Sequence, residues 1–158
     1  MGFPSPSRMV ARLSVLAALM LFALQAQAQD DFHFPGDPPS HHVVYQLNKA
    51  DWEYQEHILN SVSAMIGKYG DNVEIAVVVI GPGIHILAKE PERLVPEVIK
   101  DRVRNMAENY GVRFIACGNT MKTLGWTMDD MQPYIEYAEV GASALMELQE
   151  EGFAYIAW

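Results

Sequence analysis

The eight residues VEIAVVVI, at positions 73–80, constrain the fold more than any other stretch of this sequence. All but one of them are apolar, so the segment shows no alternation between a wet face and a dry face. Such a continuous run is typical of a central strand in a parallel sheet, where helices cover both faces. The protein is therefore expected to place helices on both sides of a sheet.

Strand-like and helix-like segments alternate on either side of this run. The crossovers between the strands are long enough for parallel pairing, and each should be right-handed. We therefore predict an α/β fold: a three-layer sandwich with a five-stranded, mainly parallel sheet and helices on both faces. The other predicted strands are residues 43–47, 112–116, 134–140 and 153–157, and the predicted helices are residues 51–69, 84–90, 96–110, 119–124 and 141–151.

Apolar side chains at helical spacing predict which face of the two longest helices is buried. Between the third and fourth strands, Thr127 and Asp130 resemble a capping box for a short turn. The predicted buried stripes are Trp52, Leu59, Val62, Ile66 and Tyr69 in the first helix, and Ile99, Val103, Met106 and Tyr110 in the second.

The N-terminus has the pattern of an export signal rather than of a folded element. Arg8 and Arg12 precede an apolar run at residues 13–24. Ala26-Gln27-Ala28 then supplies the small-x-small pattern of a signal-peptidase cleavage site. The alternative is an uncleaved anchor, but a run this short does not cross the roughly 30 Å apolar core of a bilayer as a helix. We predict a signal peptide and a periplasmic or secreted protein, with no membrane insertion after cleavage.

The chain after the signal peptide divides into a leader and one domain. Residues 29–42 are rich in Pro, Asp and His and lack any apolar period, which predicts a flexible leader. Residues 43–158 then form the α/β domain, which is large enough to bury a core. The domains are thus predicted as 1–28, 29–42 and 43–158.

The acidity of the chain and its single cysteine limit the classes of function. The formal net charge is −9, so binding to nucleic-acid phosphates is disfavoured. Cys117 is the only cysteine and has no partner within the chain for a disulfide. It is either a buried, inert side chain or a thiol that reacts with another molecule.

The segment FIACGNTMK places Cys117 where a predicted strand meets a predicted helix. Thiolates are stabilised by free N–H groups and by the positive end of a helix. Gly118 permits a tight turn, Asn119 and Thr120 can donate hydrogen bonds, and Lys122 can add positive charge. These residues predict a site for a thiolate, a persulfide or another small anion, whereas the alternative is a cysteine buried at a strand end.

A second loop is expected at the same edge of the sheet. Gly81, Gly83 and His85 follow the central strand, and ligands of α/β proteins bind outside the carboxyl ends of the strands. His85 can orient a ligand or act as a base, although a packed or exposed loop histidine is the simpler interpretation. The loop lacks the Lys and Ser/Thr of a P-loop, so no nucleotide cofactor is predicted.

Metal binding is also not predicted. His33, His41 and His42 lie with several aspartates in the leader, and imidazoles with carboxylates can bind transition metals. None of them has the ligand spacing of a helical or finger site. We interpret these residues as a solvated tail.

Three segments in order resemble the DsrE/DsrF-like family, which includes subunits of sulfur relays. They are VVVIGPG at residues 77–83, ACGNTMK at 116–122 and VGASALMELQEEGFAYIAW at 140–158. The resemblance implies a five-stranded α/β sandwich and assembly into oligomers. It also implies that the cysteine at position 117 matches the one that carries sulfur as a persulfide in the relay members.

The predicted signal peptide separates this chain from the cytoplasmic members that it resembles, so transfer of sulfur to tRNA is disfavoured. We predict an exported, homo-oligomeric sulfur carrier or sulfurtransferase-like partner that uses Cys117. Its partner would be a sulfur donor or acceptor protein or a small sulfur compound. The alternatives are a non-catalytic module that binds a small ligand or anion, and a structural oligomer subunit with an inert Cys117.

Overall fold

Five parallel strands form one sheet, as predicted from the sequence. The order of the strands, which was not predicted, is β4-β3-β2-β1-β5. The computed structural model describes residues 33–158, and residues 34–158 make up one compact unit. The expected signal peptide and the first part of the expected leader lie outside the described residues. The strands are β1 (His41–Leu47), β2 (Val73–Val79), β3 (Arg113–Cys117), β4 (Glu136–Ala138) and β5 (Ala154–Ile156).

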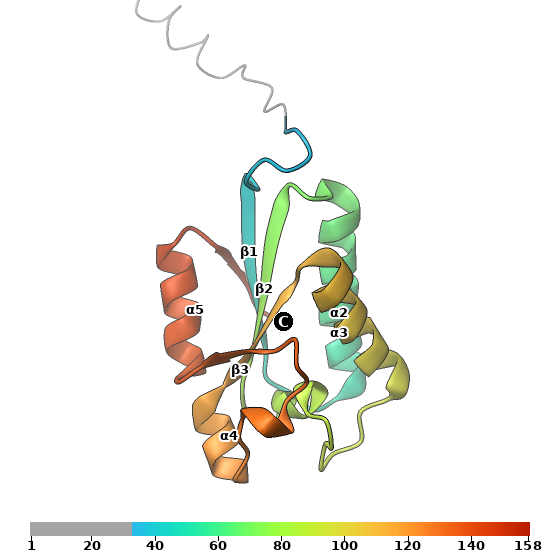
Figure 1. The fold of residues 1–158 in the computed structure, drawn as a ribbon, viewed down its shortest axis with the longest axis vertical. Coiled ribbons are helices and arrows are strands. Elements are labelled where there is room, and N and C mark those ends of the chain that lie inside the picture. The colour runs from blue at the N-terminus through green and yellow to red at the C-terminus, as the bar shows by residue number, and fades with distance from the viewer. Residues whose placement is uncertain (1–32) are drawn as a thin grey trace, which may run out of the picture. The chain divides into compact units, whose positions relative to one another are not determined.

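Helices cover both faces of this sheet, which confirms the three-layer prediction. In Figure 1, α2 and α3 lie on one face and α5 lies on the other, while α4 lies at the end of the sheet where the strands finish. The helices are α2 (Trp52–Tyr69), α3 (Glu97–Tyr110), α4 (Gly118–Leu124) and α5 (Gly141–Glu150), with 3-10 helices η1 (Gly81–Leu87) and η2 (Met128–Asp130).

The central strand β2 is buried on both faces, as its continuous apolar run predicted. Ile75, Val77 and Val79 belong to the larger core under α2 and α3. Ala76 and Val78 belong to a smaller core under α5. The period of two along a strand sends successive side chains to opposite faces, so each face receives its own apolar set.

The local sequence explains where the long helix α2 begins and ends. The Asp51 side chain accepts a hydrogen bond from the Tyr54 N–H at 2.9 Å and so caps the first turn. Gly70, with a φ of 61°, ends the helix, and its N–H donates to the Ile66 carbonyl. The predicted capping box of Thr127 and Asp130 is also present, at the start of η2.

Several boundaries differ from the predictions. Strand β1 begins at His41, because its first residues pair in register with the start of β2, so His41 and His42 belong to the sheet and not to the leader. Strand β4 is limited to Glu136–Ala138, since it lies at an edge and pairs only with the last residues of β3. The short helix after β2 starts at Gly81 rather than at residue 84, and it is a 3-10 helix.

Two members of the predicted buried stripes are exposed. Trp52 is 49% exposed and Tyr110 is 57% exposed. Trp52 is the first residue of α2 and Tyr110 is the last residue of α3. The apolar spacing in the sequence extends to these two helix ends, but Trp52 and Tyr110 lie past the edge of the buried core.

Candidate functional site

Cys117 is the last residue of β3 and immediately precedes α4, which confirms the predicted junction. It lies two residues after Ile115, so its side chain points to the α5 face of the sheet. There the Gly141 N–H donates a hydrogen bond to the Cys117 sulfur at 3.2 Å. Gly141 is the first residue of the ten-residue helix α5, whose amino end therefore faces the thiol. The cysteine itself is 3% exposed.

Two opposing effects set the protonation of this thiol. Burial raises the pKa of Cys117, but hydrogen bonds from the Thr120 hydroxyl and from the N–H groups of Thr120, Gly141 and Asn119 lower it. Together these hydrogen bonds outweigh burial, and the thiol pKa lies below its ordinary value. A cysteine that acted only as a small apolar side chain would not need four such donors.

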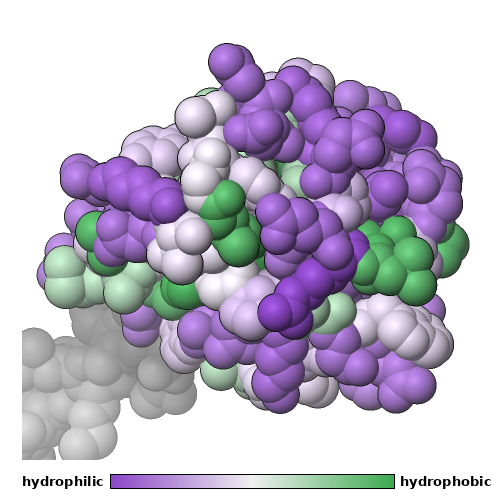
Figure 2. Space-filling view, turned by 90° about the horizontal axis from the view of Figure 1, so that it is seen from below, coloured by the Kyte–Doolittle hydropathy of each residue, from purple (hydrophilic) through white to green (hydrophobic). Residues whose placement is uncertain are grey.

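Hydrogen bonds join three loops around the thiol. The Thr120 hydroxyl oxygen accepts from the Gly81 N–H at 2.9 Å, which links the loop after β2 to α4. The Asn119 N–H donates to the Glu139 carbonyl at 3.1 Å, which links α4 to the segment after β4. Parallel strands end at one edge of a sheet, so segments far apart in sequence meet there. Figure 2 views the molecule from this edge and shows mostly hydrophilic residues with small, separate hydrophobic patches.

Glycines allow these loops to approach closely. A Cβ on Gly141 would lie 2.9 Å from the Cys117 Cβ and 2.8 Å from Ile80. A Cβ on Gly118 would lie 2.4 Å from the Tyr137 hydroxyl. Each of these distances is shorter than a normal carbon contact, so a side chain at either position would displace the groups around the thiol.

Two predicted site residues lie apart from the thiol. The Lys122 side chain is 63% exposed, and its Nζ lies 3.8 Å from Glu139. Its charge therefore faces solvent and a carboxylate instead of the sulfur. The His85 ring is buried and packs edge-on against Trp126, with 5.1 Å between the ring centroids.

The chemistry of His85 is that of a neutral, packed imidazole. Burial lowers the pKa of His85, the charge of Arg93 lowers it further, and Glu92 opposes them weakly. Its Nδ1 is buried and has no hydrogen-bond partner within the described part of the chain. The simpler of the two predicted interpretations, a packed loop histidine, matches these contacts.

The sequence analysis missed Gly141 and the Glu139 carbonyl. Their contribution follows from strand order, because β4 lies beside β3 and the residues after β4 must then lie beside Cys117. Strand order was not predicted. The sequence signal at Gly141 is the segment VGASALM that carries the family resemblance, and nothing in that segment alone indicates a donor to the sulfur.

The histidines of the expected leader also have structural contacts. His41 lies against the Tyr69 ring, and His42 lies 3.8 Å from Glu74 and edge-on to Phe153. Among residues 33–158, no group of three or more His, Cys, Asp or Glu side chains is arranged to hold a metal ion. In the same part of the chain, no helix has both the length and the apolar character needed to cross a membrane.

The fold and the thiol site define a class: a five-stranded parallel α/β sandwich with one cysteine at the carboxyl edge of its sheet. A model of the DsrE/DsrF-like family matches residues 41–158. The chain belongs to this family, which confirms the resemblance drawn from its three motifs.

Solved structures show the same fold. A protein of unknown function from Methanobacterium thermoautotrophicum, MTH1491, is 25% identical over 75% of this chain and all of its own, with a TM-score of 0.67. The ychN protein of E. coli is 11% identical over 75% of this chain and 99% of its own, with a TM-score of 0.63, and at that identity it supports the fold alone. A comparison with curated proteins gave no match.

Proposed function

We propose that this protein carries sulfur as a persulfide on Cys117. The observation that carries the proposal is the Gly141 N–H at 3.2 Å from the sulfur, together with the Thr120 hydroxyl and the neighbouring N–H groups that lower the thiol pKa. These donors favour a thiolate in the free protein, and the same donors suit the terminal sulfur of a persulfide, which is also an anion near neutral pH. Family membership supports the same role.

The transfer step needs no oxidant. The Cys117 thiolate attacks the outer sulfur of a donor persulfide, a new sulfur–sulfur bond forms, and the old one breaks. The donor leaves as a thiolate, and Cys117 keeps the transferred sulfur. The acceptor reaction is the same exchange in the opposite direction, with an acceptor thiolate as the attacking group.

The low exposure of Cys117 limits which donors can react. A side chain that is 3% exposed admits a small sulfur compound or a narrow cysteine-bearing loop more readily than a broad protein surface. The proposed partner is therefore a small persulfide or a protein that presents its persulfide at the tip of a loop.

Mass spectrometry after incubation with glutathione persulfide tests this proposal. We expect wild-type protein to gain the mass of one sulfur atom at Cys117, and Cys117→Ser to gain none. The added sulfur should be removed by a thiol reductant. Failure of the folded wild-type protein to gain a reducible sulfur would contradict the proposal and favour an inert buried cysteine.

We further propose that the carrier is exported and assembles with copies of itself. The Arg-flanked apolar run and Ala26-Gln27-Ala28 support export. The exposed side chains of Tyr137, on the edge strand β4, and of Val140, just after it, support assembly. Exported protein should have an intact mass that begins at Gln29, and light scattering should give a multiple of that mass. A retained N-terminus would contradict export, and a monomer mass would contradict assembly.

A further inference from the structure

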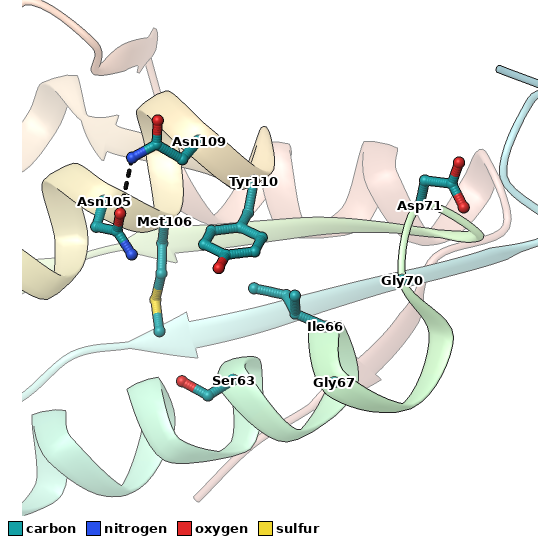
Figure 3. Close-up of a pocket in the computed structure, with 9 residues that line it drawn as sticks. All are labelled: Ser63, Ile66, Gly67, Gly70, Asp71, Asn105, Met106, Asn109 and Tyr110. Carbon is teal, nitrogen blue, oxygen red and sulfur yellow. Dashed lines mark hydrogen bonds between the residues drawn. The ribbon is translucent and has the colours of Figure 1, made fainter. Parts of the chain in front are cut away.

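A groove lies between the carboxyl-terminal halves of α2 and α3, away from the thiol. These helix ends lead into the first residues of β2 and β3, so the groove is at the amino edge of the sheet, and Cys117 is at the carboxyl edge. Its volume is about 680 Å³, which is within the usual range of small-molecule sites. Figure 3 shows the side chains that line it, among them Ser63, Ile66, Asn105, Met106 and Tyr110.

One part of the groove is apolar and aromatic. Met106 is 4% exposed and belongs to the core, and Ile66 packs against the same core. The Tyr110 ring lies over the groove above Ile66 in Figure 3, and this side chain is 57% exposed. An exposed aromatic ring above apolar side chains is a surface on which a planar ring can stack.

Gly67 leaves one wall of the groove bare. It lies inside the last turns of α2, where glycine weakens a helix relative to alanine. Among the described residues, no atom outside the neighbouring backbone of α2 lies within 4 Å of the position that its Cβ would take. Packing within the domain therefore does not require glycine here, and the bare backbone leaves room for a molecule to approach α2 closely.

At the other part of the groove, Asn105 and Ser63 can donate hydrogen bonds, while the Asp71 carboxylate of the lining lies beyond Gly70, away from Asn105, in Figure 3. The Asn109 amide donates to the Asn105 side-chain oxygen at 2.7 Å, and this leaves the Asn105 NH₂ group directed toward the groove in Figure 3. The Ser63 hydroxyl lies on the opposite wall and accepts from Arg102 Nη2 at 3.3 Å, and its own proton can be donated to a ligand. This end of the groove matches an acceptor oxygen.

We propose that the groove binds a small planar aromatic or heteroaromatic molecule that bears a carbonyl or carboxylate oxygen. The ring lies between Tyr110 and the backbone at Gly67, over Ile66 and Met106. The oxygen accepts hydrogen bonds from the Asn105 amide and the Ser63 hydroxyl, with the Arg102 guanidinium behind them. This site is separate from the proposed sulfur chemistry, because it shares no residue with the Cys117 loops.

NMR titration with three probes of one shape tests the proposal. Benzamide and benzoate carry the acceptor oxygen, and benzylamine carries a cationic donor in its place. Molecules of this size bind on the order of millimolar. We expect saturable shifts of the Gly67, Asn105 and Tyr110 resonances with benzamide or benzoate, and at least tenfold weaker binding of benzylamine. Equal or tighter binding of benzylamine would overturn the proposed ligand class.

Variants separate the groove from other surfaces of α2. Gly67→Leu fills the groove and should abolish the shifts, while Ala64→Leu places the same side chain at an exposed position of α2 outside the lining and should keep them. Asn105→Asp keeps the size of the side chain but removes the donor, so it should weaken benzoate at least tenfold without affecting the fold. Shifts that persist in Gly67→Leu would overturn the proposal. So would groove resonances that move with protein concentration alone, because a second copy would then cover the groove.

Discussion

Gly83→Ala is expected to lower the free energy of unfolding by about 3 kcal/mol, because the new methyl group has no space. Its Cβ would lie 2.5 Å from the Leu47 side chain and 2.8 Å from the Leu47 carbonyl oxygen. Leu47 is the last residue of β1, it is fully buried, and its carbonyl also accepts a hydrogen bond from the Ile80 N–H. The backbone there is held by the sheet, so η1 must move instead.

Gly118→Ala provides the matched comparison, since its Cβ also lies too close to a neighbour. That neighbour is the Tyr137 side chain, whose hydroxyl oxygen would lie 2.4 Å from the new Cβ. Tyr137 is on the edge strand β4 and is 48% exposed. A side chain on an edge strand can move away from α4 more easily than the backbone at Leu47 can shift, so we expect a loss of about 1 kcal/mol. Urea unfolding of the two variants measures the difference. Equal losses would show that η1 adjusts as easily as an exposed tyrosine ring.

Gly67→Ala is the control for the loss of glycine itself. No described atom outside the neighbouring backbone of α2 lies within 4 Å of its Cβ, and alanine is the better helix former. We expect this variant to be more stable than the wild type by about 1 kcal/mol. A destabilised Gly67→Ala would mean that the crowding distances at Gly83 and Gly118 are not what decides the cost.

The periodicity of the sequence was sufficient to predict the layers of the fold. The apolar run at β2 required cover on both faces, and the predicted ends of the two long helices, at residues 69 and 110, match α2 and α3. The ends of elements were less predictable, because they depend on neighbours in space. His41 is a strand residue only because β2 offers it a partner at Val73.

The thiol site was predicted only in part, because some of its groups come from segments that are neighbours in space but not in sequence. Cys117, Asn119 and Thr120 were found because they are contiguous and follow a strand. The donors from Gly141 and the link from Thr120 to Gly81 depend on which strands are neighbours, and local sequence does not contain that information. His85 and Lys122 were included for their chemistry alone, and their side chains pack or point elsewhere.

Thr120→Val should raise the pKa of the Cys117 thiol and slow its reaction with small alkylating reagents. Valine has nearly the shape of threonine but lacks the hydroxyl that helps to lower this pKa. At a fixed pH below the thiol pKa, each unit by which the pKa rises lowers the thiolate fraction about tenfold. The rate of alkylation by iodoacetamide, measured against pH, should therefore show its midpoint at a higher pH in the variant than in the wild type.

The same substitution should also cost stability and so report on the second role of this hydroxyl. The Gly81 N–H would lose its acceptor, which costs about 1 kcal/mol for a half-buried group. Thr120→Ser keeps the hydroxyl and should restore both the pKa and the stability. Thr123→Val is the control on the same helix, because its hydroxyl donates to the Asn119 carbonyl on the exposed side. An unchanged midpoint in Thr120→Val, or an equal shift in Thr123→Val, would show that the Thr120 hydroxyl does not tune the thiol. The proposed persulfide site would then lose the hydrogen bond that contributes most to lowering its pKa.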